Sequence, residues 1–227
     1  MLDRSNGKTL NLQAVIFDYG DVLCSRPTAG EIEDSARILG IAPDQFRTLW
    51  GRHRDAFDRG DLSSDGYWRK FAEDAGRSVD AAQLRDLAEK DVAMWSRINP
   101  DMIAWLEDLS RTGVKTAVLS NMHADMAEYA RKNFQWLTGV SFVTLSAEVR
   151  MIKPDPAIYQ HCLQGLGVAA SQALFIDDRE VNIAAAIALG IHGIQFSSIA
   201  QLRGELEAAR LPILLPETQR QGRLRVS

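Results

Sequence analysis

The chain has 227 residues, of which 46% are hydrophobic and 25% are charged, with a formal net charge of −4. This composition is typical of a globular protein of one or two domains, and the negative charge gives no electrostatic reason to expect nucleic acid. No apolar run is long enough to span a membrane, and the first residues lack a signal-peptide pattern. Cys24 and Cys162 lie in no metal or disulfide motif, so we expect a reduced, cytoplasmic protein.

The first predicted element is a strand that ends at Asp18. Residues 12–23 read LQAVIFDYGDVL, and the run is apolar from 14 to 17. Such a run is typical of a strand buried on both faces of a parallel sheet. Ligands of open α/β sheets bind outside the carboxyl ends of the strands. Asp18 is therefore a candidate functional residue, although an Asp that opens a turn with Gly20 would show the same pattern.

Residues 25–98 contain no strand-like run and predict four helices instead. Apolar residues recur at helical spacing in the segments 28–39, 43–58, 64–74 and 80–95. We therefore expect an all-helical unit, rich in aromatic residues, inserted directly after the first strand. His53 lies in a charged stretch of this unit, where a solvated histidine is more common than a substrate contact or an acid.

An alternating α/β pattern resumes at residue 99. We expect strands near 114–119, 140–143, 173–176 and 191–196, and helices near 100–111, 124–134, 156–166, 181–189 and 198–210. Strands separated by helices indicate βαβ units, a parallel sheet and right-handed crossovers. The tail from Leu211 has little pattern, and we expect its end to be mobile.

Polar residues gather where the predicted strands end. Asp18, Ser120, Asp177 and Asp178 follow three strands, and Lys153 lies in a loop before a helix. Three carboxylates in one place need a cation, and Mg²⁺ prefers oxygen ligands. A phosphate is the ligand that suits Mg²⁺, a lysine and a hydroxyl together. Taken singly, each residue has an ordinary alternative as a helix cap, a turn residue or a surface lysine.

Four motifs occur in order along the chain. They are FDYGDVL at 17–23, LSN at 119–121, KPDP at 153–156, and IDD at 176–178 with Asn182 on the next helix. Together they resemble the haloacid dehalogenase-like hydrolase superfamily. The resemblance implies a Rossmann-like α/β core of residues 1–24 and 99–227, a helical cap of residues 25–98, and Mg²⁺-dependent phosphoryl transfer from a small phosphorylated metabolite.

The resemblance also implies roles for individual residues. Asp18 would be the nucleophile and a metal ligand, and the metal site would be completed by the carbonyl of Gly20 and by two carboxylates, Asp177 and Asp178. The phosphoryl group would be held by Ser120, Asn121 and Lys153. A carboxylate that attacks phosphorus divides hydrolysis into formation and breakdown of an aspartyl phosphate.

One position departs from the family pattern. Phosphatases of the family usually carry a second Asp two residues after the nucleophile as general acid and base, and Gly20 stands there. Asp21 follows, but in an extended segment it would point to the opposite face. Three outcomes are open: Asp21 or His123 substitutes, the substrate has a good leaving group, or turnover is slow. The DxGxVL pattern resembles the branch with glucose-1-phosphate phosphatases, which makes a sugar phosphate the first expectation.

Two other functions compete with a phosphatase. A 2-haloacid dehalogenase would use Asp18 to attack carbon without a metal, and it would not need Asp177 and Asp178 as a pair. A phosphate-binding regulatory protein would keep the site without turnover, as Gly20 would allow. Full activity in the presence of a chelator would indicate the dehalogenase. Thermal stabilisation by a ligand without product release would indicate the phosphate-binding protein.

Overall fold

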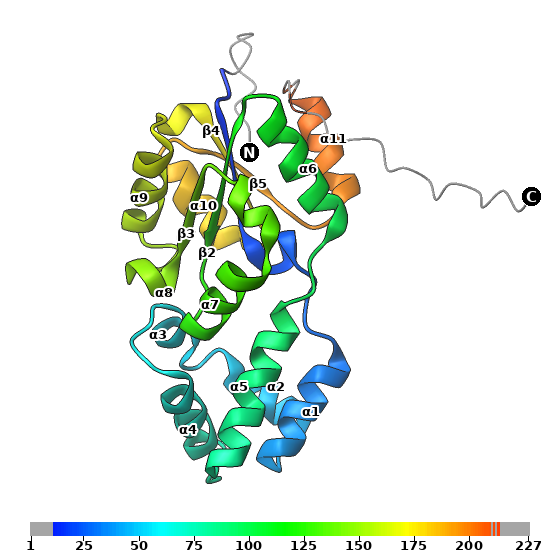
Figure 1. The fold of residues 1–227 in the computed structure, drawn as a ribbon, viewed down its shortest axis with the longest axis vertical. Coiled ribbons are helices and arrows are strands. Elements are labelled where there is room, and N and C mark those ends of the chain that lie inside the picture. The colour runs from blue at the N-terminus through cyan, green and yellow to red at the C-terminus, as the bar shows by residue number, and fades with distance from the viewer. Residues whose placement is uncertain (1–10, 210, 212, 214–227) are drawn as a thin grey trace, which may run out of the picture.

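The computed structural model describes residues 11–209, 211 and 213, and in it the five predicted strands form one parallel sheet (Figure 1). The strands are β1 (Ala14–Phe17), β2 (Lys115–Ser120), β3 (Phe142–Leu145), β4 (Ala173–Asp177) and β5 (His192–Gln195). Their order is β3-β2-β1-β4-β5, so β1 is central and lies where the order reverses. Ligands of such sheets bind at the carboxyl ends beside this reversal.

Helices cover both faces of the sheet. One face packs against α6 (Pro100–Arg111), α7 (Ala124–Asn133) and α11 (Ile199–Ala208), and the other against α9 (Pro156–Leu166) and α10 (Glu180–Ala188). Successive residues of β1 enter opposite cores: Phe17 packs with Trp105 on the first face, whereas Ile16 packs with Tyr159 on the second. This two-sided burial explains the unbroken apolar run of β1. Cys24 and Cys162 are buried free thiols.

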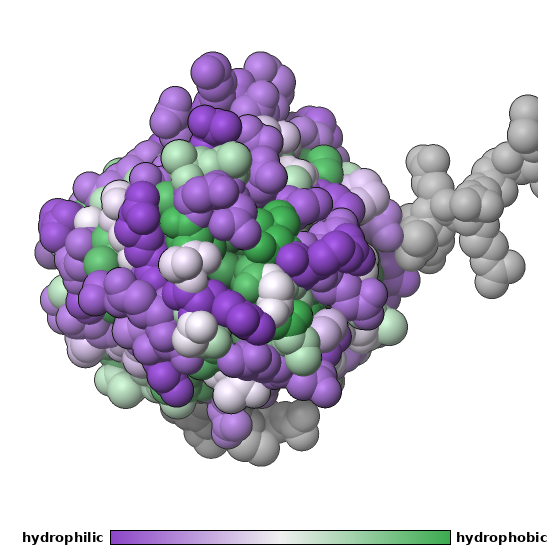
Figure 2. Space-filling model, turned by 90° about the horizontal axis from the view of Figure 1, so that it is seen from below, coloured by the Kyte–Doolittle hydropathy of each residue, from purple (hydrophilic) through white to green (hydrophobic). Residues whose placement is uncertain are grey.

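A separate group of helices lies beyond the carboxyl ends of the strands (Figure 1). These are α1 (Ala29–Leu39), α2 (Pro43–Trp50), α3 (Arg54–Asp58), α4 (Ser64–Asp74) and α5 (Ala81–Trp95), called the cap helices below. They have their own aromatic core, which includes Phe46, Trp68 and Phe71. An antiparallel bridge between Cys24 and Ile98 joins the two connections to the sheet. Figure 2 views this end, where hydrophilic residues surround a smaller hydrophobic group. The boundaries at 25 and 98 stay a prediction.

Two details of the secondary structure differ from the sequence prediction. The helix expected at 43–58 is broken at residues 51–53 into α2 and α3. Gly51 has low helix propensity. Arg54, the first residue of α3, pairs with Asp91 of α5, a distant contact that the sequence does not indicate. A short helix, α8 (Ser146–Val149), was not predicted. No helix in the described part of the chain is long and apolar enough to cross a bilayer.

Direct contacts dock the cap helices onto the rest of the structure. The Ser146 hydroxyl donates a hydrogen bond to the carbonyl oxygen of Asp58, and the Tyr19 hydroxyl donates one to the carbonyl oxygen of Trp95. Arg150 pairs with Asp61 at 2.7 Å. Because these contacts join distant parts of the sequence, they close the cap helices over the strand ends.

Candidate active site

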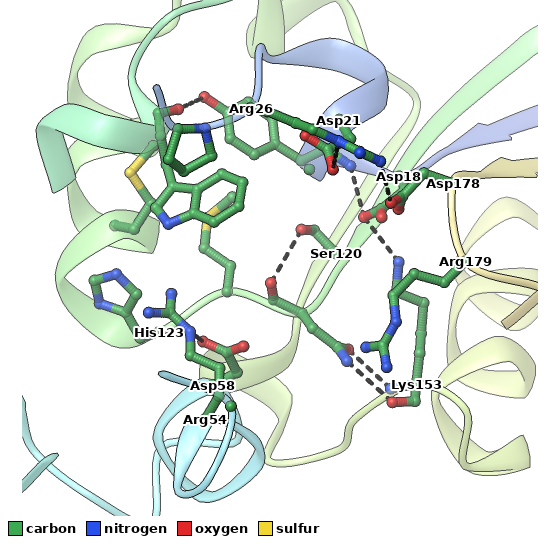
Figure 3. A pocket seen from close by; sticks show the side chains of 18 of the residues that line it. Asp18, Asp21, Arg26, Arg54, Asp58, Ser120, His123, Lys153, Asp178 and Arg179 are labelled. Atoms are coloured by element: carbon green, nitrogen blue, oxygen red, sulfur yellow. Dashed lines mark hydrogen bonds and ion pairs between the residues drawn. The ribbon is translucent and has the colours of Figure 1, made fainter. Parts of the chain in front are cut away.

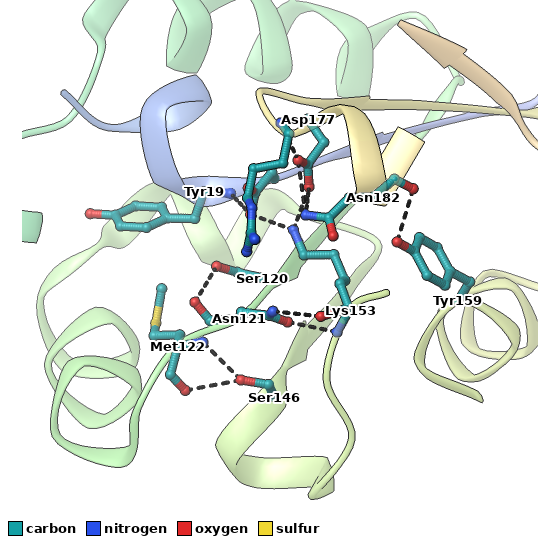
Figure 4. A network of polar contacts seen from close by, with 11 residues as sticks. Tyr19, Ser120, Asn121, Met122, Ser146, Lys153, Tyr159, Asp177 and Asn182 are labelled. Atoms are coloured by element: carbon teal, nitrogen blue, oxygen red, sulfur yellow. Dashed lines mark hydrogen bonds and ion pairs between the residues drawn. The ribbon is translucent and has the colours of Figure 1, made fainter. Parts of the chain in front are cut away.

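The strand ends bring the predicted residues together, and a buried lysine lies at the centre. The Nζ of Lys153 is 2.7 Å from Oδ1 of Asp18 and 2.6 Å from Oδ2 of Asp177 (Figure 4). The Lys153 side chain is 1% exposed, and Asp177 is fully buried. A buried charge is tolerated only when it is paired, and here one ammonium is shared by two carboxylates. The alternative that Lys153 is an ordinary surface lysine is excluded.

Asn121 fixes the backbone of the lysine. Its side-chain amide donates to the carbonyl oxygen of Lys153 at 3.0 Å, and its side-chain oxygen accepts from the Lys153 N–H at 2.8 Å. Ser120 is 2% exposed, and both it and Asn121 line the same cavity as Asp18. The motif at the end of β2 therefore contributes one hydroxyl to the cavity and one amide that positions Lys153.

Asp177 is held by several donors at once. Its carboxylate accepts hydrogen bonds from the Lys153 ammonium, from the Asn182 amide at 3.0 Å, and from the backbone N–H of Arg179 at 2.8 Å. Burial opposes its ionisation, but the Lys153 ammonium and these hydrogen bonds hold the pKa of Asp177 below its usual value. Asp177 is thus a fixed anion that orients Lys153.

A third carboxylate completes a group that could hold a metal ion. Oxygens of Asp18, Asp177 and Asp178 lie within 4.8 Å of one another. Burial raises the pKa of Asp18 to about 8 and that of Asp178 to about 6, and the Lys153 ammonium only partly offsets this. One ammonium thus leaves an excess of negative charge among three carboxylates. A hard divalent cation with oxygen ligands fits this donor set.

The backbone after Asp18 turns sharply, and this changes the position of Asp21. Gly20 has φ −60° and ψ 129°, which any residue can adopt, whereas Asp21 has φ 58° in the left-handed region. The segment is therefore not a continuous extended chain, and Asp21 lines the cavity with Asp18 (Figure 3). The expectation that Asp21 points to the opposite face was wrong, because the alternation of side chains holds only for extended backbone.

Arg26 binds this displaced carboxylate. Its Nε is 2.6 Å from Oδ2 of Asp21, and its Nη2 is 3.5 Å from Oδ2 of Asp178. The other oxygen of Asp21 is buried without a hydrogen bond among the described residues. Arg26 was not identified from the sequence. It lies in the connection to the cap helices, and nothing in the neighbouring sequence indicates that it reaches two carboxylates.

His123, a candidate acid in the sequence, lies in a buried cluster. It is 1% exposed, stacks on Phe57 with ring centroids 4.3 Å apart, and places Nε2 3.4 Å from Asp91. Arg54 joins the cluster through its ion pairs. Burial lowers the pKa of His123 to about 4, although Asp91 opposes this. His123 is therefore neutral at pH 7 and packs the cap helices against the sheet domain.

A matched substitution tests this interpretation of His123. Between pH 6.5 and 4 the unfolded state binds a proton on His123 that the folded state does not, so wild type loses stability as the pH falls through this window. His123→Phe keeps the ring stack and removes this loss. We expect its stability relative to wild type to improve by about 2 kcal/mol from pH 8 to pH 5.

Urea unfolding at both pH values measures the difference. Arg54, Asp58 and Asp91, the charged groups around the ring, are present in both proteins, and burial raises the pKa of Asp58 to about 6 in the wild-type structure. His53→Gln is the control, because His53 is partly exposed and pairs with Asp74 at 2.9 Å. A stability difference that stays constant from pH 8 to pH 5 would contradict a neutral, buried His123.

The cavity above these residues has a volume of about 600 Å³. Its charged end is formed by Asp18, Lys153 and Asp178, and the cap helices contribute Trp50 and Trp95. Figure 3 shows Arg54, Asp58 and His123 at the side opposite Asp178 and Arg179. The volume is that of a small-molecule site. His53 does not line it.

Comparison with known proteins agrees with this geometry. Residues 12–190 match the model of the haloacid dehalogenase-like hydrolase family. The chain belongs to this family. It is a hydrolase whose α/β fold contains a Rossmann-like parallel sheet, as the sequence motifs predict.

The relatives within the family include proteins named as phosphatases and proteins named as dehalogenases. The chain is 28% identical over 173 residues to phosphatase MT3486 of Mycobacterium tuberculosis, covering 74% of this chain and 80% of that protein. It is 31% identical over 197 residues to (S)-2-haloacid dehalogenase 4A of Burkholderia cepacia, covering 82% and 84%. It is 29% identical to acyl-CoA dehydrogenase family member 10 of Mus musculus, covering 86% of this chain but only 19% of that protein.

A solved structure shares the fold. The family enzyme BT-2542 of Bacteroides thetaiotaomicron, in complex with magnesium and inorganic phosphate, superposes with a TM-score of 0.66. It is 20% identical, and the match covers 84% of this chain and 98% of that one. At this identity the likeness supports the fold alone.

Proposed function

We propose that this protein is a Mg²⁺-dependent phosphatase that hydrolyses a small phosphate monoester through an aspartyl phosphate on Asp18. The observation that carries the proposal is the Lys153 ammonium, buried between Asp18 and Asp177, with Asp178 beside them. A site that combines an ammonium, a hydroxyl and a metal-binding carboxylate group suits a dianionic phosphate. Solved relatives with magnesium and phosphate support the same chemistry.

Each residue has a role in this proposal. Asp18 attacks phosphorus, and Lys153 and the Ser120 hydroxyl hold the transferring group, while Asn121 positions Lys153. Mg²⁺ would be held by Asp18, Asp178 and the Gly20 carbonyl, with Asp177 as the fourth member, and would offset the repulsion between the nucleophile and the phosphate. Asp177 also keeps Lys153 in place through the contacts described above.

Asp21 is the carboxylate available for the second step. It lines the cavity, and its Oδ1 has no hydrogen-bond partner among the described residues. We assign Asp21 the role of orienting the water that hydrolyses the aspartyl phosphate. Its partner Arg26 binds it as an anion, which suits a base better than an acid.

Phosphate release with and without metal tests the proposal. Wild-type protein is assayed with acetyl phosphate, aryl phosphates and sugar phosphates, in Mg²⁺ and in chelator. We expect release in Mg²⁺ and at least a 10³-fold loss in chelator, because the metal stabilises several kcal/mol of developing charge. The assay is repeated after Mg²⁺ is restored, which separates loss of metal from loss of fold.

Two outcomes would replace the phosphatase with another function. Halide release from a 2-haloacid in chelator, without phosphate release, would establish the dehalogenase, to which a relative at 31% identity points. Thermal stabilisation by inorganic phosphate, without release from any ester, would establish a phosphate-binding protein.

A further inference from the structure

One part of the cavity wall, next to Gly20, is aromatic. Gly20 lines the cavity together with Asp18, and its φ of −60° and ψ of 129° would accept a side chain. A Cβ built on Gly20 would lie 3.8 Å from Cζ3 of Trp95, in ordinary contact with the indole ring. The part of the substrate that leaves from phosphorus therefore meets an aromatic ring where a carboxylic acid would otherwise fit.

More apolar side chains continue this wall. Trp50 stands against Trp95 with ring centroids 6.5 Å apart, and the cavity is also lined by Tyr19, Met122 and Met126. Aromatic rings and methionines bind flat apolar groups well, through large contact area and favourable sulfur–aromatic contacts. A planar aryl ring contacts such a surface with its whole face, whereas only part of a sugar's surface is apolar.

Two of the acidic groups that line the cavity, Asp21 and Asp58, form ion pairs with arginines. Asp21 is paired with Arg26 at 2.6 Å, and Asp58 is paired with Arg54 at 3.0 Å. His123 is buried against Phe57 and Asp91. Asp21 and Asp58 are each held as an anion by an arginine, and His123 is buried, so none of the three acts as a proton donor to an alkoxide beside Trp95. A leaving oxygen that is stable as an anion does not need such help.

We propose that the substrates are aryl phosphates, whose aromatic ring lies against Trp95 and Trp50 and whose phenolic oxygen leaves without a protein acid. The proposal rests on the phosphatase function above. An oxygen of Asp18 forms a bond to phosphorus as the bond from phosphorus to the aryl oxygen breaks, and the phenolate takes a proton from water. Water then attacks the aspartyl phosphate, which restores the Asp18 carboxylate and releases inorganic phosphate. A cavity of about 600 Å³ accommodates a phosphate with one or two rings.

The dependence of the rate on the leaving group tests the proposal. kcat/KM is measured in Mg²⁺ for phenyl phosphates with graded phenol pKa, for cyclohexylmethyl phosphate, and for glucose 6-phosphate. The alkyl ester matches the apolar ring but leaves as a much stronger base. We expect aryl esters to exceed both others by at least about 10³-fold, and the rate to fall steeply as the phenol pKa rises.

Gly20→Asp is the decisive variant. Its φ and ψ accept an Asp, and its Cβ fits beside Trp95. A carboxylic acid at this position would protonate the leaving oxygen. We expect the variant to raise kcat for cyclohexylmethyl phosphate by about 10²–10⁴-fold and to flatten the dependence on phenol pKa. A purely structural role for Gly20 would instead lower all rates together.

Substitutions of Trp95 test the aromatic contact with the substrate. We expect Trp95→Ala to lower the ratio of kcat/KM for phenyl phosphate to that for acetyl phosphate by about 10–100-fold, and Trp95→Phe to restore most of it. Because the ratio compares two substrates on one protein, a partly unfolded variant does not change it. Trp136→Phe, outside the cavity, is the control and should leave the ratio unchanged.

The outcomes separate this proposal from the phosphatase function. Mg²⁺-dependent release from glucose 6-phosphate or the alkyl ester at the aryl rate, or a rate independent of phenol pKa, overturns the aryl substrate class and leaves the phosphatase standing. Absence of release from every ester, acetyl phosphate included, overturns both.

Discussion

Asp18→Asn is expected to reduce phosphate release by about 10⁴-fold or more while leaving the protein folded. Loss of a nucleophile typically costs this much, because no other group replaces the attacking oxygen. Asn has nearly the shape of Asp, so the 6% exposed site keeps its packing. Lys153 retains Asp177 as its counterion, at 2.6 Å. Replacing one of three crowded carboxylates therefore relieves repulsion and should not lower the free energy of unfolding.

The measurement combines kinetics with detection of the intermediate. Acid-quenched wild-type protein that is turning over acetyl phosphate should carry one phosphoryl group on the peptide containing Asp18, and the Asn variant should carry none. Asp86→Asn, an exposed residue on α5, is the control for loss of an aspartate and should keep the wild-type rate. Retention of more than about 1% of the wild-type rate by Asp18→Asn would refute covalent catalysis at this residue, since the expected loss is at least a hundred times larger.

The sheet and the strand-end residues were predictable because their signals are local. Each strand is a short apolar run, and the residue that ends or directly follows it reaches the carboxyl edge: Asp18 follows β1, and Ser120 and Asp177 end β2 and β4. The family motifs then placed Lys153 at the same edge, where the structure finds it.

Features that depend on distant contacts were not predictable. His123 is next to a conspicuous motif, but its burial comes from Phe57 and Asp91 on the cap helices, which the sequence does not place. Asp21 reaches the cavity only because its φ is positive, and a non-glycine residue in that region leaves no sequence signal. The break before Arg54 likewise depends on its ion pair with Asp91, 37 residues away.

Lys153→Met is expected to lower both activity and stability. The substitution removes the only ammonium that the structure places between Asp18 and Asp177, so two buried carboxylates lose their counterion. Breaking a buried pair in this way costs about 3–5 kcal/mol of unfolding free energy. Activity should fall by about 10³-fold or more, because the transferring phosphoryl group loses its fixed positive charge.

A second substitution separates the two effects. In Lys153→Met with Asp177→Asn, one of the unpaired charges is gone, and Asn182 can still hydrogen-bond the new amide. We expect the double variant to recover about 2 kcal/mol of stability or more, since one uncompensated buried charge is removed, but no activity. Urea unfolding and phosphate release measure the two quantities independently.

Lys153→Arg completes the series, because it keeps the charge but not the compact geometry of an ammonium. We expect it to be more stable than Lys153→Met and still to have lost most of its activity, since a planar guanidinium cannot occupy the point shared by both carboxylates. If Lys153→Met were as stable as wild type, the lysine would not be the counterion that holds this edge of the sheet together. If the double variant recovered activity along with stability, Lys153 would act only by organising the site, and the phosphoryl group would have to be held by Ser120 and the metal ligands alone.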